Sequence, residues 1–104
     1  SITFANDDIK ARLLAEQRVE AERVILAIQS ALDVDGDKFL NDDERSELVK
    51  GINKLKELTD SDNAESIKQA ANDLNQLSEV FASRRMDASI RSVMAGHNIN
   101  EFSE

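Results

Sequence analysis

The sequence predicts an all-α fold: a three-helix antiparallel bundle with a long protruding first helix and a short fourth helical segment. The chain of 104 residues has no proline and only three glycines, so few positions interrupt a helix. Tyrosine and tryptophan, which favour strands, are absent. Apolar residues recur every three or four positions over three stretches, which is the period of an amphipathic helix. A chain of this length can bury one modest core, so we expect a single domain.

The first predicted helix covers residues 5–32, and the rest of the chain is organised around it. Asn6 or Asp7 can cap its start. The helix would extend roughly 42 Å, whereas the second helix would reach only about 26 Å. About the first four turns are therefore expected to project as an arm without a partner. The second half carries the core-facing stripe Ala21, Val24, Ile25, Ile28, Ala31 and Leu32.

The second predicted helix covers residues 42–58. Asn41 is a favourable N-cap, Glu44 stands at the capping-box position, and Leu40 is placed to form a hydrophobic staple. Gly51 is expected to be exposed and to lower helix stability by about 1 kcal/mol. The apolar stripe consists of Leu48, Val49, Ile52, Leu55 and Leu58.

The third predicted helix covers residues 62–85 and follows a polar break. Asp60, Ser61 and Asp62 are its candidate caps. Glu65 would complete a capping box with Asp62. The pattern places Arg84 and Arg85 as a helix-end charge pair, and the stripe consists of Ile67, Ala70, Ala71, Leu74, Leu77, Ser78 and Phe81.

The remaining residues are predicted to add little to the core. Residues 86–95, with the apolar Ile90, Val93 and Met94, either continue the third helix or bend off as the short fourth segment, and Gly96 is a natural stop. We expect residues 97–104 to be a flexible tail and residues 1–4 to be a disordered or expression-derived start. Because the chain opens with Ser1 rather than methionine, we expect it to be an excised piece of a longer protein.

The charge and composition exclude several classes of function. The net charge of -8 is spread along the chain, which opposes binding to nucleic acids and to anionic membranes. No apolar run approaches the ~18 residues of a membrane span, and no signal peptide is visible. Without cysteine, disulfides and thiolate metal sites are excluded, and we expect a cytoplasmic location.

The sequence predicts no catalytic and no cofactor-binding residue. His97 is the only histidine, and no second histidine, cysteine or carboxylate pair stands near it in the sequence. The serines and threonines lack the partners of a nucleophile, and no glycine-rich phosphate loop is present. We therefore expect that this chain by itself is not an enzyme.

One acidic stretch has the spacing of a calcium-binding EF-hand loop, with helices predicted on both sides. Lys38 stands at the sixth position, where the loop requires a glycine, and Gly36 comes two residues too early. The alternative is a polar loop between two helices. If calcium binds, its ligands would be Asp33, Asp35, Asp37 and Glu44, with Leu40 at the apolar eighth position.

Two blocks resemble a known family. IKARLLAEQRVEAERV (residues 9–24) and FASRRMDASIRSVMAGHNINE (residues 81–101) are similar to the C-terminal lid subdomain of the HscA family, the DnaK-type chaperones of iron–sulfur cluster assembly. The resemblance covers nearly the whole chain. It implies a lid over a peptide-binding β-sandwich that would precede Ser1. The stretch after residue 32 departs from the family because it is more acidic than expected.

The resemblance also implies partners that these residues do not contain. The parent chaperone would hydrolyse ATP in an earlier domain, work with the J-domain co-chaperone HscB, and bind the cluster scaffold protein IscU as its client. The arm is expected to face the β-sandwich through Ile9, Leu13 and Leu14. Glu22 falls near the acidic residue that latches such lids.

In the isolated chain, we expect Leu13 and Leu14 to mediate an antiparallel self-association.

Overall fold

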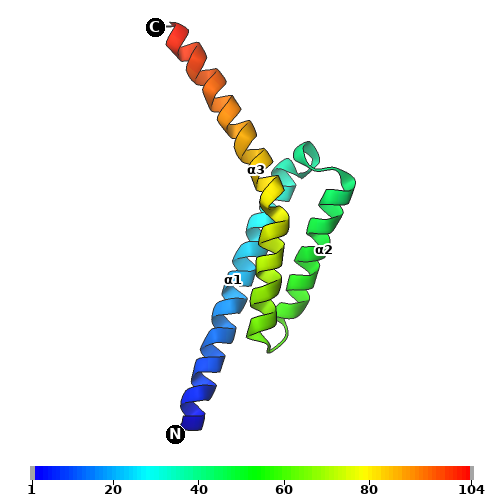
Figure 1. Cartoon of the computed structure of the whole chain (residues 1–104), viewed down its shortest axis with the longest axis vertical. Helices are drawn as coiled ribbons and strands as arrows, with labels where there is room; N and C mark the ends of the chain where they lie inside the picture. Colours follow the sequence, from blue (N-terminus) through cyan, green and yellow to red (C-terminus); the bar gives the residue numbers. More distant parts are fainter. Residues whose placement is uncertain (1, 104) are drawn as a thin grey trace.

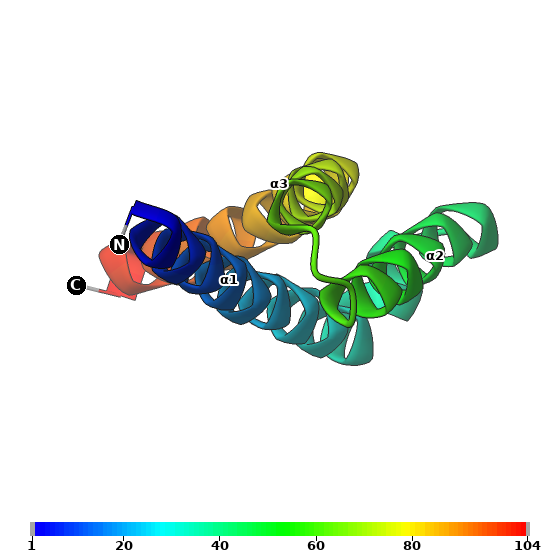
Figure 2. The same ribbon diagram turned by 90° about the horizontal axis from the view of Figure 1, so that it is seen from below.

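The computed structural model describes the backbone of residues 2–103 and the side chains of residues 6–96. It contains three helices, α1 (Ile2–Phe39), α2 (Asp42–Thr59) and α3 (Ala64–Ser103). They run up, down and up in a bundle whose first helix projects at one end and whose third helix projects at the other (Figure 1; Figure 2). The molecule measures 71 × 34 × 17 Å. The predicted all-α bundle with a protruding first helix is confirmed.

A single apolar core joins the three helices in the middle of the molecule. The predicted stripe of α1 is buried in full, and Leu55 and Ile67 are completely covered. Two predicted core residues, Val49 and Leu77, are instead more than two-fifths exposed and border surface grooves. The core consists of Ala21, Val24, Ile25, Ile28, Ala31, Leu32, Leu48, Ile52, Leu55, Ile67, Ala70, Ala71, Leu74 and Phe81.

The expectation that α1 ends at residue 32 is wrong, since the helix continues to Phe39. The prediction took the glycine-bearing acidic stretch after Leu32 as the turn between two helices, and carboxylates near a helix C-terminus do oppose the helix dipole. In the structure, Asp35 accepts a hydrogen bond from Arg85 of α3, and Asp37 is paired with Arg45 of α2. These contacts compensate the charge of the last two turns.

The start of α2 is confirmed. The Asn41 side chain accepts a hydrogen bond from the Glu44 backbone N–H at 2.8 Å, and Glu44 accepts from the Asn41 N–H at 3.0 Å. Leu40 packs against the core, as expected of a hydrophobic staple. At α3 the predicted Asp62 box is wrong, because Asn63 accepts the hydrogen bond from the Ser66 N–H.

The predicted fourth segment is not a separate element, because α3 runs without a break from Ala64 to Ser103. No residue in the described part of the backbone has a positive φ, so Gly96 does not stop the helix. Arg84 and Arg85 consequently lie within α3 rather than at its end. The flexible tail predicted for residues 97–104, the predicted start at residues 1–4 and the side chain of His97 lie outside the residues whose side chains are described.

Candidate partner-binding surfaces

The N-terminal arm, which we define as residues 6–17 of α1, carries an apolar ridge without a partner. Ile9 is 56% exposed and Leu13 is 47% exposed. The two residues are four positions apart, so their side chains are neighbours on one face of the helix. The arm extends beyond the end of α2 and the start of α3 (Figure 1), so nothing in the described part of the chain covers the ridge. The ridge is an available contact surface.

The other two predicted partner-facing residues differ from this ridge. Leu14 is half-buried and packs against the core, so it is not free to contact a partner as predicted. This leaves Leu13 without its expected neighbour on the surface. Glu22 is exposed beside the hollow formed with Arg18, Thr59 and Asp60, at the base of the arm.

Arg18 fixes the base of the N-terminal arm to the connection between α2 and α3. Its Nε donates a hydrogen bond of 2.9 Å to the Thr59 carbonyl oxygen, and its terminal nitrogen donates one of 2.9 Å to that of Ser61. The same guanidinium lies 3.3 Å from Asp62. Carbonyls at a helix C-terminus lack helical partners and favour a cation, so α1 and α2 are joined at this point.

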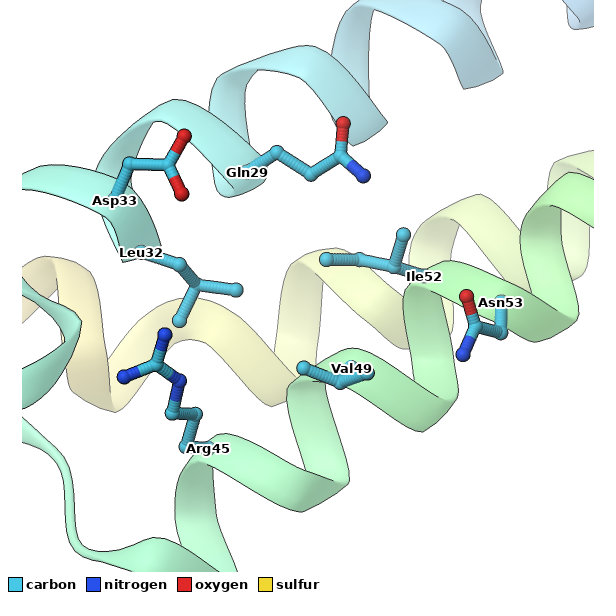
Figure 3. Close-up of a pocket in the computed structure, with 7 residues that line it drawn as sticks. All are labelled: Gln29, Leu32, Asp33, Arg45, Val49, Ile52 and Asn53. Atoms are coloured by element: carbon cyan, nitrogen blue, oxygen red, sulfur yellow. The ribbon is translucent and has the colours of Figure 1, made fainter.

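A second surface is an open groove of about 390 Å³ between α1 and α2. Leu32, Val49 and Ile52 form its apolar floor, and polar side chains from both helices stand along its rim (Figure 3). The polar residues are Gln29, Asp33, Arg45 and Asn53. The groove therefore combines an apolar floor with a polar rim along the seam between α1 and α2.

The acidic stretch does not have the geometry of a calcium loop. Asp33, Asp35 and Asp37 lie on helix α1, where residues two positions apart point to different sides. Asp33 borders the groove, while Asp35 and Asp37 are bound by arginines of α3 and α2. Among the described residues, no three carboxylates or histidines are grouped so as to hold a metal ion.

Glu44 takes part in a contact, centred on Arg84, that joins all three helices at this end of the bundle. Arg84 of α3 donates a hydrogen bond of 2.8 Å to its carboxylate and one of 2.7 Å to the carbonyl oxygen of Phe39. The hydrogen bond from Arg84, with a further one from the Asn41 backbone, lowers the pKa of Glu44 below its ordinary value of 4.5. The same pairing raises the pKa of Arg84. The contact holds α3 against the α1–α2 corner.

A third surface lies where α3 projects past this corner. We define the C-terminal arm as residues 86–96. The exposure of its apolar residues was not predicted from the sequence, although their phase relative to Phe81 is a signal for it. Its large apolar side chains are all exposed, namely Met86, Ile90, Val93 and Met94.

The fold and its surfaces define a helical module whose free faces suit contacts with other proteins. The Hsp70 protein family model matches residues 1–87, and the chain therefore belongs to the Hsp70 family. Within the described part of the chain, no helix has the length and apolarity needed to cross a membrane.

Comparison with individual proteins narrows this class and confirms the predicted resemblance. The chain is similar to the chaperone protein HscA homolog of Vibrio cholerae, with 52% identity over 102 residues, which are 98% of this chain and 17% of that relative. Identity to the homolog of Vibrio campbellii is 48% over 98% of the chain and 16% of that relative. Identity to the chaperone protein HscA homolog of Pseudomonas aeruginosa is 40% over the whole chain, which corresponds to 17% of that relative. The chain thus spans about one-sixth of the length of these curated relatives.

Proposed function

We propose that this chain is the helical lid subdomain of a DnaK-type chaperone, which closes over a peptide-binding β-sandwich and slows the release of client peptides. The observation that carries the proposal is the apolar ridge of Ile9 and Leu13 on an arm that the bundle leaves uncovered. A helix of this length is marginal in water without a partner. The β-sandwich is the partner that the family resemblance implies.

The bundle suits the role of a support for such an arm. The arm and the core belong to one continuous helix, so a contact made at Leu13 is transmitted along α1 without an intervening hinge. Arg18 ties the base of the arm to the α2–α3 connection. Glu22, exposed on the same helix, is the candidate for a polar latch to the sandwich.

The similarity to HscA homologs supports a finer proposal for the parent protein. It would assist the maturation of iron–sulfur proteins in an ATP-dependent cycle in the cytoplasm, with IscU as client and HscB as co-chaperone. ATP would bind to a domain outside this chain. In this proposal the lid contributes binding contacts only, and ATP hydrolysis takes place in the other domain.

The experiment measures peptide release from the full-length chaperone. We expect Leu13→Asp, and removal of residues 1–19, to speed the dissociation of a fluorescent client peptide while basal ATP hydrolysis stays nearly unchanged. Leu26→Asp is the matched control, because Leu26 is similarly exposed but lies on the part of α1 beside the core. Unchanged peptide release in both altered proteins would overturn the lid proposal. Faster release with Glu22→Gln would identify Glu22 as the latch.

A further inference from the structure

The C-terminal arm presents four exposed large apolar side chains and lies at the end of the bundle opposite the N-terminal arm (Figure 1). Met86 is 64% exposed, Ile90 49%, Val93 67% and Met94 57%. These residues recur at intervals of three and four, so they form one stripe along the helix. Because the proposed lid contact uses Ile9 and Leu13, it leaves this stripe uncovered.

The stripe faces away from the core of the bundle. Ile90 follows the buried Phe81 by about two and a half helical turns, which places the two side chains on opposite sides of α3. On the side towards α1, a hollow against Phe39 is bordered by Arg84, Asp87, Ala88 and Arg91. The apolar face therefore changes sides where α3 leaves the bundle. Its partner must come from outside, because neither α1 nor α2 lies on that side.

We propose that the occupant is the C-terminal arm of a second copy of this chain, packed antiparallel about a two-fold axis at Ile90. Within the stripe, Met86 and Met94 each lie four positions from Ile90 and are symmetric about it, whereas the counterpart of Val93 is Asp87. In the dimer Ile90 meets Ile90, and Met86 of each copy meets Met94 of the other. Such a contact is isologous and closes after two copies.

The charges beside the stripe favour the same arrangement. Asp87 and Arg91 lie one helical turn apart on the flank of α3 between the stripe and the hollow at Phe39, and within the described part of the chain neither forms an ion pair. Antiparallel packing about Ile90 brings Asp87 of each copy close to Arg91 of the other. Two such pairs of opposite charge outnumber the one contact between the two Arg91 side chains near the axis, so the charges favour the antiparallel arrangement.

The general family match and the matches to the HscA homologs end at different places in the chain. This difference agrees with a role of the C-terminal arm that is particular to the HscA homologs. The general Hsp70 family model matches the chain up to residue 87. The similarity to the HscA homologs covers 98% to 100% of the chain and so extends through the C-terminal arm. Most of the arm is therefore shared with these homologs and lies outside the general family match.

Self-association is tested on the 104-residue chain. We expect sedimentation to show a mass that rises with concentration from 11.6 kDa towards twice that value. Ile90→Asp should abolish the rise, and Leu13→Asp should leave it unchanged, with helicity followed by circular dichroism to confirm that both variants fold. A monomer at millimolar concentration would overturn the proposal. So would a dimer that Leu13→Asp dissociates and Ile90→Asp does not, which is the contact predicted from the sequence.

Cross-linking tests the geometry, and the absence of cysteine from the chain makes single-cysteine variants specific. Ile90→Cys would place two thiols on the two-fold axis, so mild oxidation with diamide should give a disulfide-linked dimer. Ser92→Cys is the matched control, since it is exposed on the same arm but on the opposite side of the helix. Equal cross-linking of the two variants would overturn the antiparallel arrangement.

Discussion

Arg84 and Glu44 lie forty positions apart in the chain and are joined by a hydrogen bond of 2.8 Å. The same Arg84 nitrogen also donates to the Phe39 carbonyl oxygen near the end of α1. Glu44 in turn belongs to the capping box of α2. One guanidinium therefore connects the end of α1, the start of α2 and the middle of α3.

This contact predicts a pH dependence of stability. The pKa of Glu44 is lowered in the folded state, so the carboxylate stabilises the fold above its unfolded value of 4.5, and this contribution is lost as the pH falls through the lower folded value. We expect Glu44→Gln to be less stable than the unmodified chain at neutral pH and to lose less stability on acidification. Urea unfolding at several pH values measures this. Arg84→Ala should have the same effect, and an additive loss in the double variant would contradict the coupling.

A second prediction concerns the base of the N-terminal arm. Arg18→Ala removes the donor that binds the Thr59 and Ser61 carbonyl oxygens, so the first turns of α1 should separate more readily from the α2–α3 connection. We expect faster amide hydrogen exchange around residues 14–21 and a stability loss of about 1 kcal/mol. Arg23→Ala is the control, because Arg23 pairs with Glu20 on its own helix. Equal exchange in the two variants would show that Arg18 does not anchor the arm.

A third prediction concerns the stability contributed by Leu55, which is fully buried in the core. Leu55→Ala should lower the free energy of unfolding by about 2–5 kcal/mol, through lost burial and a residual cavity. Leu26→Ala removes the same number of atoms from an exposed site and should change it by less than about 0.5 kcal/mol. Denaturant unfolding compares the two variants. Similar losses would contradict the assignment of the core.

Gly51 was expected to be an exposed helix residue, but it is half-buried against α3. A Cβ atom there would lie 2.8 Å from Cδ1 of Leu74, which is 1% exposed. We expect Gly51→Ala to destabilise the chain, because a clash costing about 1–3 kcal/mol exceeds the helix-propensity gain of about 1 kcal/mol. In a Leu74→Ala background the same change should become neutral or stabilising. A gain in stability in the unmodified background would show that α2 and α3 adjust freely.

The structure of residues 33–44 predicts that the chain does not bind calcium. Because Asp35, Asp37 and Glu44 are bound by three arginines and Asp33 faces the groove, we expect no heat in a calorimetric titration with millimolar calcium and no change in helicity. A saturable heat that Glu44→Gln removes would instead support the EF-hand alternative. A calcium-binding EF-hand protein titrated in parallel verifies the sensitivity of the measurement.

Contacts between residues close in sequence were predictable. The capping box of Asn41 and Glu44, the buried stripe of α1 and the projecting arm all follow from spacings of three and four residues or from helix length. Such patterns act within one helix, so they can be identified without knowledge of the neighbours. The same holds for the free ridge of Ile9 and Leu13, because it depends on how far α1 exceeds its partners.

The sequence by itself therefore determined the helical class, the core-facing stripes and the cap of α2. Only the tertiary structure decided where α1 ends, which carboxylates are bound, and that α3 continues past the bundle. Asp35 stays in a helix because Arg85, fifty positions away, donates to its carboxylate. Local propensity disfavours acidic residues at that helix end, and a long-range ion pair outweighs it. Pairings over such separations become visible only once the helices are packed together.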